Sequence, residues 1–315
     1  MGISLIKIIV GLLLLYIGAE GLVLASSSLA LRLRVSPLMI GLTIVACGTS
    51  MPELIVSLKT ALSGQGSITI GNVVGSNIFN IAVILGLSAL IYPLKVNIKL
   101  IRLDTPIMIL AALIFGLLFY DMHLSRFEGL ILLLLVILYT FINFYMARNA
   151  SKKDIVQIKK ETLSSKPLGN IYHETIILIA GFFILICGAN YLVDGSIRLA
   201  GIIGVSEAII GLTVIAAGTS WPELATSIVA AFRKHPDIAV GNIIGSNIFN
   251  IFGILGISSL LSPITGAGIN FVDVYVMIAL SIILLPLMWS GFELKRWEGL
   301  VLIGGYIGYI YHLIR

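Results

Sequence analysis

Two matched segments place a glutamate next to a proline inside long apolar stretches. They read GTSMPE at 48–53 and GTSWPE at 218–223. Proline lacks an N–H and clashes with the carbonyl four residues earlier, so each proline frees main-chain oxygens within its helix. In each segment the Glu follows the Thr by four residues, on the same helix face. Two broken helices are therefore predicted to present carboxylate, carbonyl and hydroxyl oxygens from Thr49, Glu53, Thr219 and Glu223.

A second matched pair of segments carries amide and hydroxyl side chains. GNVVGSNIFN occupies 71–80 and GNIIGSNIFN occupies 241–250. Within each segment Asn, Ser and Asn are spaced by four residues, which places them on one stripe of a helix. Asn72 and Asn242 could equally be ion ligands or hydrogen-bonding links between helices. The serine and the second asparagine of each segment are therefore better candidate ligands. The two stripes consist of Asn72, Ser76, Asn80, Asn242, Ser246 and Asn250.

All of these groups are hard oxygen ligands. Ca²⁺ takes about 6–8 oxygens at roughly 2.3–2.6 Å. Zinc and copper favour Cys and His, which neither pair of segments contains. Two glutamates also neutralise the charge of one Ca²⁺. The motifs therefore predict a calcium site built from both copies.

The composition places most of the chain in lipid. Of its 315 residues 58% are hydrophobic and 11% are charged, with a mean hydropathy of +1.09, whereas soluble domains have about 25% charged residues. The net charge of +5 does not indicate nucleic-acid binding, because the basic residues lie between apolar runs rather than along one face. Apolar runs long enough to cross a ~30 Å hydrocarbon core predict ten helices, near 3–25, 36–62, 69–92, 105–121, 127–147, 174–194, 206–232, 240–262, 272–290 and 297–313.

The matched segments belong to a duplication of the whole chain. GLTIVACGTSMPEL at 41–54 matches GLTVIAAGTSWPEL at 211–224, and RFEGL at 126–130 matches RWEGL at 296–300, so the offset is 170 residues (41 to 211, 126 to 296). Because each copy has an odd number of spans, the second must enter the membrane from the opposite side, as in the inverted repeats of transporters. We therefore predict an all-α membrane protein with ten transmembrane helices in two inverted five-helix repeats. Its parts are a first repeat at 1–147, a short basic linker at 148–172 and a second repeat at 173–315.

The basic residues predict the orientation of the repeats. Fifteen of the twenty Lys and Arg residues fall in the connections after the first, third, fifth, seventh and ninth runs. By the positive-inside rule these connections face the cytoplasm. The chain is therefore predicted to be a multi-pass protein of the cell membrane, with both termini outside and the linker in the cytoplasm.

The motifs resemble those of one transporter family. GTSMPEL with GNVVGSNIFN, and GTSWPEL with GNIIGSNIFN, are similar to the paired repeats of the sodium/calcium exchanger family, in its prokaryotic form without a regulatory domain. The resemblance implies an antiporter in which Na⁺ entry drives Ca²⁺ export by alternating access. It implies three Na⁺ per Ca²⁺, and therefore net movement of charge. It also implies no enzymatic activity, no cofactor, and a site that a single chain in a lipid bilayer can form.

By motif position, the resemblance also assigns roles to residues. It implies that Glu53 and Glu223 hold Ca²⁺ with the main-chain oxygens of Thr49 and Thr219. The flanking Na⁺ sites would draw on Ala46, Ser50, Ser76, Ala216, Ser220 and Ser246, and the set of candidate ligands also includes Asn80 and Asn250. Potassium-dependent relatives have Asp in place of Asn250, so this chain offers only two carboxylates.

Other functions are compatible with the same residues. A Ca²⁺/H⁺ antiporter could return with protonated glutamates, although protons need no shell of Ser, Thr and Asn oxygens. A potassium-dependent exchanger and a passive cation channel are further alternatives, and coupling to ion gradients separates the channel from an antiporter. A hydrolase could use two carboxylates as acid and base, but it has no need of an inverted repeat. Glu20, whose counterpart is Asn190, is expected to make a structural contact rather than to bind an ion.

Overall fold

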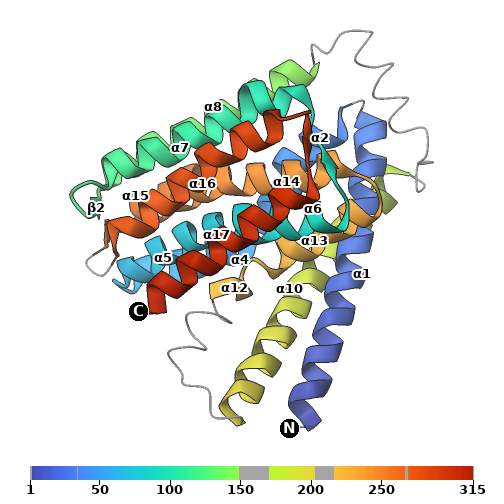
Figure 1. The fold of residues 1–315 in the computed structure, drawn as a ribbon, viewed down its shortest axis with the longest axis horizontal. Coiled ribbons are helices and arrows are strands. Elements are labelled where there is room, and N and C mark those ends of the chain that lie inside the picture. The colour runs from blue at the N-terminus through green and yellow to red at the C-terminus, as the bar shows by residue number, and fades with distance from the viewer. Residues whose placement is uncertain (1, 34, 149–169, 203–215, 267–268, 315) are drawn as a thin grey trace.

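The computed structural model describes most of the chain, which is mainly helical (Figure 1). The described residues are 2–33, 35–148, 170–202, 216–266 and 269–314. Most of the predicted linker at 148–172 and the first part of the predicted span at 206–232 lie outside them.

The two predicted repeats contain corresponding elements. Those of the first are α1 (Gly2–Leu33), α2 (Pro37–Ile40), η1 (Gly41–Val45), α3 (Ala46–Thr49), α4 (Met51–Leu62), α5 (Gly66–Phe79), η2 (Asn80–Leu85), α6 (Gly86–Ile91), η3 (Leu100–Asp104), α7 (Thr105–Leu118) and α8 (Arg126–Arg148). Those of the second are α10 (Ile171–Ile202), α12 (Ala216–Gly218), α13 (Trp221–Phe232), α14 (Pro236–Ile248), η5 (Phe249–Leu255), α15 (Gly256–Leu261), α16 (Phe271–Trp289) and α17 (Arg296–Ile314). The η elements are π-helical turns, in which hydrogen bonds span five residues instead of four.

The described helices support a multi-pass membrane protein. Seven of them are long and apolar enough to cross a membrane. The pair Pro37–Thr49 and Met51–Leu62 is bent by 45°, and it gives an eighth if it counts as one span. The number of ten stays a prediction, because part of the corresponding pair in the second repeat lies outside the described residues and the last predicted span, at 297–313, is not among the seven helices.

Both predicted helix breaks occur at the serine of the repeated motif. Ser50 (φ −81°, ψ 8°) separates α3 from α4, and Ser220 (φ −88°, ψ 6°) separates α12 from α13. The prolines that follow, Pro52 and Pro222, lie in the first turn of the new helices, where a backbone N–H would have no intrahelical partner. Each motif glutamate therefore lies at the start of a helix.

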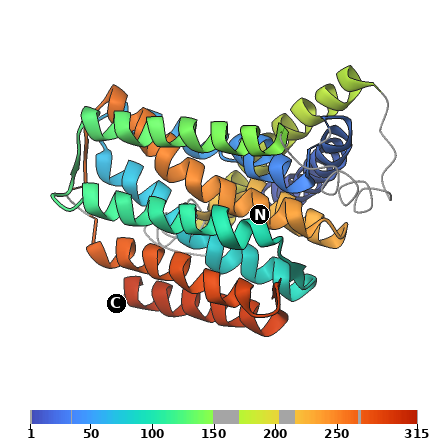
Figure 2. The ribbon, with the colours of Figure 1, turned by 90° about the horizontal axis from the view of Figure 1, so that it is seen from above.

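The helices α1 and α10 pack along each other at one side of the bundle (Figures 1 and 2). A Cβ added to Gly18 would lie 2.9 Å from the carbonyl oxygen of Gly181, and one added to Gly11 would lie 2.6 Å from the main-chain nitrogen of Leu192. These positions require glycine, because the two backbones are in direct contact there.

The two repeats interlock in the rest of the bundle. The last helix of each repeat packs on the other repeat, α8 on α15 and α17 on α6. Short antiparallel strands also pair across the repeats, β1 (Leu94–Lys95) with β4 (Glu293–Leu294) and β2 (His123–Leu124) with β3 (Ile264–Thr265). In the described chain these strands depart from the predicted all-α fold. They form because the extended connections between helices must pair their backbone N–H and C=O groups.

The helices that carry the second motif form the centre of the molecule. In the most apolar window of Pro236–Leu261, 94% of residues are buried, compared with 22% in Arg126–Met146. The helix α8 therefore presents most of its surface to the surroundings, whereas α14 and η5 are enclosed by other helices. Polar side chains on those central elements must find partners within the protein.

Candidate cation-binding site

The two motif glutamates are completely buried, and each is held by the opposite repeat. Ser220 Oγ donates to Glu53 Oε1 at 3.0 Å, and Ser50 Oγ donates to Glu223 Oε1 at 2.9 Å. The serines at the helix breaks are themselves fully buried. Because the exchange is reciprocal, neither repeat alone can build this arrangement.

A second set of hydrogen bonds also crosses between the repeats. Thr49 Oγ1 donates to Asn242 Oδ1 at 3.1 Å, and Thr219 Oγ1 donates to Asn72 Oδ1 at 3.3 Å. The four residues come from the two pairs of motifs that were identified in the sequence. The structure therefore places the motif with Glu and the motif with Asn side by side, with each copy facing the other repeat.

Two serines outside the predicted site hold the first asparagine of each stripe. Asn72 Nδ2 donates to Ser57 Oγ at 2.9 Å, and Asn242 Nδ2 donates to Ser227 Oγ at 3.2 Å. These hydrogen bonds link neighbouring helices, which is the structural role considered for Asn72 and Asn242. The two serines lie at matching positions of the repeats, 170 residues apart (57 to 227). This match is the signal in the sequence by which they could have been found.

Several buried oxygens in the motifs have no hydrogen-bond partner among the described residues. They are Glu53 Oε2, Ser76 Oγ, Asn80 Oδ1, Glu223 Oε2 and Asn250 Oδ1. A buried acceptor without a partner costs about 1–3 kcal/mol, and more when it is charged. A cation bound among these oxygens would remove that cost and would find the hard ligands that Na⁺ and Ca²⁺ need.

The residues expected at the Na⁺ sites also lie on contacting elements. Ser246 Oγ donates to the main-chain oxygen of Ala46 at 3.4 Å. On the other side α5, which carries the buried Ser76, contacts the short helix α12 that begins at Ala216. The structure thus brings together elements from opposite repeats at both predicted positions.

One side of the site is open to a cavity. Thr219 and Pro52 line a cavity of about 600 Å³, together with an ion pair in which Lys7 Nζ lies 2.9 Å from Asp194 Oδ2. Thr219 is partly exposed, whereas its counterpart Thr49 is only 1% exposed. The access is therefore on the side of Thr219.

The opposite side is closed by packing. The ring of Phe182 lies against Gly48, while Leu12, the counterpart of Phe182, is 49% exposed. A Cβ added to Gly245 would lie 2.5 Å from a main-chain oxygen of η1. The two repeats therefore have similar sequences but different local packing.

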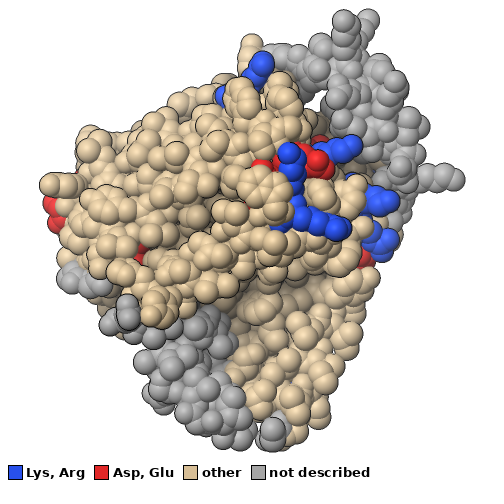
Figure 3. All heavy atoms as spheres, viewed as in Figure 1, with Lys and Arg blue, Asp and Glu red and all other residues tan. Residues whose placement is uncertain are grey.

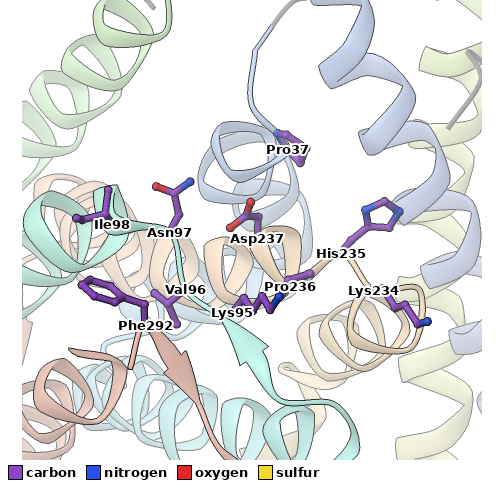
Figure 4. Close-up of a pocket in the computed structure, with 10 residues that line it drawn as sticks. All are labelled: Pro37, Lys95, Val96, Asn97, Ile98, Lys234, His235, Pro236, Asp237 and Phe292. Carbon is purple, nitrogen blue, oxygen red and sulfur yellow. The ribbon is translucent and has the colours of Figure 1, made fainter. Parts of the chain in front are cut away.

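Figure 4 shows a second cavity, of about 520 Å³. Its lining contains none of the predicted ion-binding residues; it consists of Pro37, Lys95, Val96, Asn97, Ile98, Lys234, His235, Pro236, Asp237 and Phe292. Burial, and secondarily the charge of Arg233, lower the pKa of His235.

The charged side chains outside the site make contacts between helices. Glu20 on α1 forms an ion pair with Arg233 at the end of α13, so it makes the structural contact expected of it. Arg32 Nε lies 2.8 Å from Glu174 Oε2 and ties α1 to α10. On the face shown in Figure 3, Lys and Arg side chains gather at one end of the bundle.

Comparison with known proteins identifies the family. The model of the sodium/calcium exchanger protein family matches residues 3–145 and 173–315, which covers both repeats. The chain belongs to the sodium/calcium exchanger family.

Relatives match over nearly the whole chain. The sodium/calcium exchanger MaX1 of Methanosarcina acetivorans is 35% identical, with 98% of this chain and 97% of the relative covered. The inner membrane protein YrbG of Escherichia coli is 40% identical, with 95% and 93% covered. A solved structure of the sodium-calcium exchanger NCX_Mj superposes with a TM-score of 0.83 at 32% identity, covering 98% of this chain and 97% of the other. Sodium/calcium exchangers are membrane transporters rather than enzymes, and these matches support cation/Ca²⁺ exchange by this chain.

Proposed function

We propose that the chain is an electrogenic antiporter that exchanges Na⁺ for Ca²⁺ by alternating access. The observation that carries the proposal is the reciprocal holding of two buried carboxylates, Glu53 by Ser220 and Glu223 by Ser50. Each glutamate keeps a second oxygen without a partner among the described residues. Two such oxygens from opposite repeats make a site of charge −2, which matches one Ca²⁺.

The proposed ligands are oxygens from both repeats. Ca²⁺ is bound by the two glutamates with the main-chain oxygens of the two motif threonines, and Na⁺ ions occupy the flanking positions. Protons need no shell of Thr, Ser and Asn oxygens, so the oxygens that flank the proposed Ca²⁺ position favour Na⁺ as the second ion. The complete proposed set is Ala46, Thr49, Ser50, Glu53, Ser76, Asn80, Ala216, Thr219, Ser220, Glu223, Ser246 and Asn250.

Alternating access fits a protein made of two inverted repeats, 1–147 and 173–315. Under this proposal the cavity that reaches Thr219 is the external entrance. The placement of the basic residues supports this orientation, with both termini outside the cell membrane and the linker at 148–172 in the cytoplasm.

The charge balance supports electrogenic exchange. Three Na⁺ ions at a site of charge −2 leave +1, whereas one Ca²⁺ leaves zero. A cycle with this stoichiometry moves one net charge across the membrane and must respond to the membrane potential.

Proteoliposomes containing the purified chain test the proposal. We expect ⁴⁵Ca²⁺ uptake when Na⁺ is loaded inside and diluted outside, with no requirement for K⁺ and no uptake from a pH gradient alone. Valinomycin and K⁺ can then clamp the potential at two values, and the uptake rate should differ between them. Robust Ca²⁺ accumulation from a pH gradient in the absence of Na⁺ would instead identify a Ca²⁺/H⁺ antiporter.

A further inference from the structure

Four buried asparagines form two hydrogen bonds between the repeats. Asn80 Nδ2 donates to Asn247 Oδ1, and Asn250 Nδ2 donates to Asn77 Oδ1, both at 3.0 Å. All four side chains are at most 1% exposed. Asn77 and Asn247 directly follow the motif serines, and the preceding proposal gives them no role.

The outer partners of Asn77 and Asn247 fix the orientation of their amides. Asn77 Nδ2 donates to the main-chain oxygen of Asn247 at 3.3 Å and to Met277 Sδ at 3.7 Å, and Asn247 Nδ2 donates to Met108 Sδ at 3.6 Å. A carbonyl oxygen and a thioether sulfur can only accept hydrogen bonds. Each NH₂ group must therefore face these acceptors, and each Oδ1 must face the asparagine of the other repeat.

The orientation of Asn77 and Asn247 determines the orientation of their partners, Asn250 and Asn80. Because Asn77 and Asn247 present oxygens, Asn250 and Asn80 must turn their NH₂ groups toward them. The Oδ1 atoms of Asn80 and Asn250 are then left without a partner among the described residues. An amide that is held in this way offers only an acceptor to the rest of its surroundings.

The available oxygens lie on elements next to the two glutamates. The turn η2, which begins at Asn80, contacts α13, the helix of Glu223. The turn η5, which contains Asn250, contacts α4, the helix of Glu53. A π-helical turn at this point is typical of a functional site.

We propose that Asn77 and Asn247 are positioning residues that hold the amide oxygens of Asn80 and Asn250 available to the transported cation. The inference rests on the proposed function, since it assigns those oxygens to the cation. Without the positioning residues, the freed amides turn and donate their NH₂ groups to the carboxylates, and the NH₂ groups then oppose cation binding.

Calorimetric Ca²⁺ titration of the purified full chain tests this role. We expect Asn247→Ala to weaken Ca²⁺ binding by at least about tenfold, because a hydrogen bond to a charged group shifts an equilibrium by roughly ten- to a hundredfold. In the Asn80→Asp background the same substitution should cost less than about twofold, since both oxygens of a carboxylate are acceptors and need no orientation. An equal loss in both backgrounds would show a merely structural role and would overturn the inference.

A gentler pair of variants provides a second test. Met108→Leu removes the acceptor that Asn247 Nδ2 has among the described residues, whereas Met277→Leu leaves Asn77 Nδ2 its main-chain acceptor. Met and Leu have similar volumes, so both variants should fold. Met108→Leu should weaken Ca²⁺ binding more than Met277→Leu, and equal effects would count against the inference.

The same titration separates this inference from the proposed function. If Glu53→Gln abolishes Ca²⁺ binding while Asn247→Ala binds normally, the cation site stands and the positioning role is overturned. If the unmodified chain binds no Ca²⁺, both are overturned.

Discussion

The replacement of Glu53 by Gln is the most direct perturbation of the proposed site. Gln has nearly the same shape, and its amide oxygen can still accept the hydrogen bond that Ser220 Oγ donates at 3.0 Å. The fold should therefore survive. What disappears is one of the two negative charges that face the cation.

The expected loss of binding is large. With an effective dielectric constant of about 20, a carboxylate at about 2.4 Å attracts a divalent cation by about 14 kcal/mol. Reduced dehydration cost and the dipole of the Gln amide oxygen recover much of this. If only a third remains, Ca²⁺ affinity still falls by more than about a thousandfold, since about 4.1 kcal/mol corresponds to that factor.

The assay is Na⁺-driven ⁴⁵Ca²⁺ uptake, together with Ca²⁺ titration of the same preparation. Glu223→Gln should behave like Glu53→Gln, because the two residues have equivalent partners in opposite repeats. Glu293→Gln, at a partly buried carboxylate in β4, is the matched control and should transport normally. Near-normal flux in either site variant would refute the proposed site, and loss in only one of them would refute its two-fold arrangement.

Three further predictions concern protons, charge and packing. Acid pH should inhibit Na⁺-driven Ca²⁺ uptake, because protons compete for the two glutamates, but a pH gradient should not drive uptake by itself. In a pH series His235→Asn should leave this inhibition unchanged, because His235 lines a separate cavity. The unmodified chain should need no K⁺, and Asn250→Asp, which adds a third negative charge, should either create K⁺ dependence or slow Na⁺-driven exchange in the same vesicles. Gly245→Ala should lower the thermal unfolding midpoint of the purified protein, because the added Cβ would lie 2.5 Å from a main-chain oxygen of η1 and overpacking costs about 1–3 kcal/mol. Gly304→Ala, at an exposed position of α17, should not lower it, and equal midpoints would contradict the packing around Gly245.

The sequence predicted the parts of the site that depend on identical motifs at a fixed offset. The helix breaks at Ser50 and Ser220 followed from the behaviour of proline. The pairing of each glutamate with a serine of the opposite repeat could not be predicted, because a single sequence does not show which surfaces of the two repeats are in contact. The same limitation applies to Asn77 and Asn247, whose importance depends on partners in the other repeat.

A duplicated pair of hydrogen bonds shows another limit of the fixed offset. Tyr139 donates its hydroxyl to Asp104 at 3.0 Å, and Tyr309 donates to Asp273 at 2.8 Å. The tyrosines are 170 residues apart (139 to 309), but the aspartates are 169 apart (104 to 273). A one-residue difference in the preceding connection hid this match. The π-helical turns were also missed, because apolar periodicity does not distinguish one widened turn from an α-helix.

The unequal packing of the two repeats has a consequence for the conformation that opens to the opposite side of the membrane. In an inverted repeat, exchange of the conformations of the halves moves the opening to the other side of the membrane. Under the proposed mechanism, each residue would then take the surroundings of its counterpart 170 positions away. Thr219 would become buried, Thr49 would face a cavity, and Leu12 would take the place that Phe182 has now.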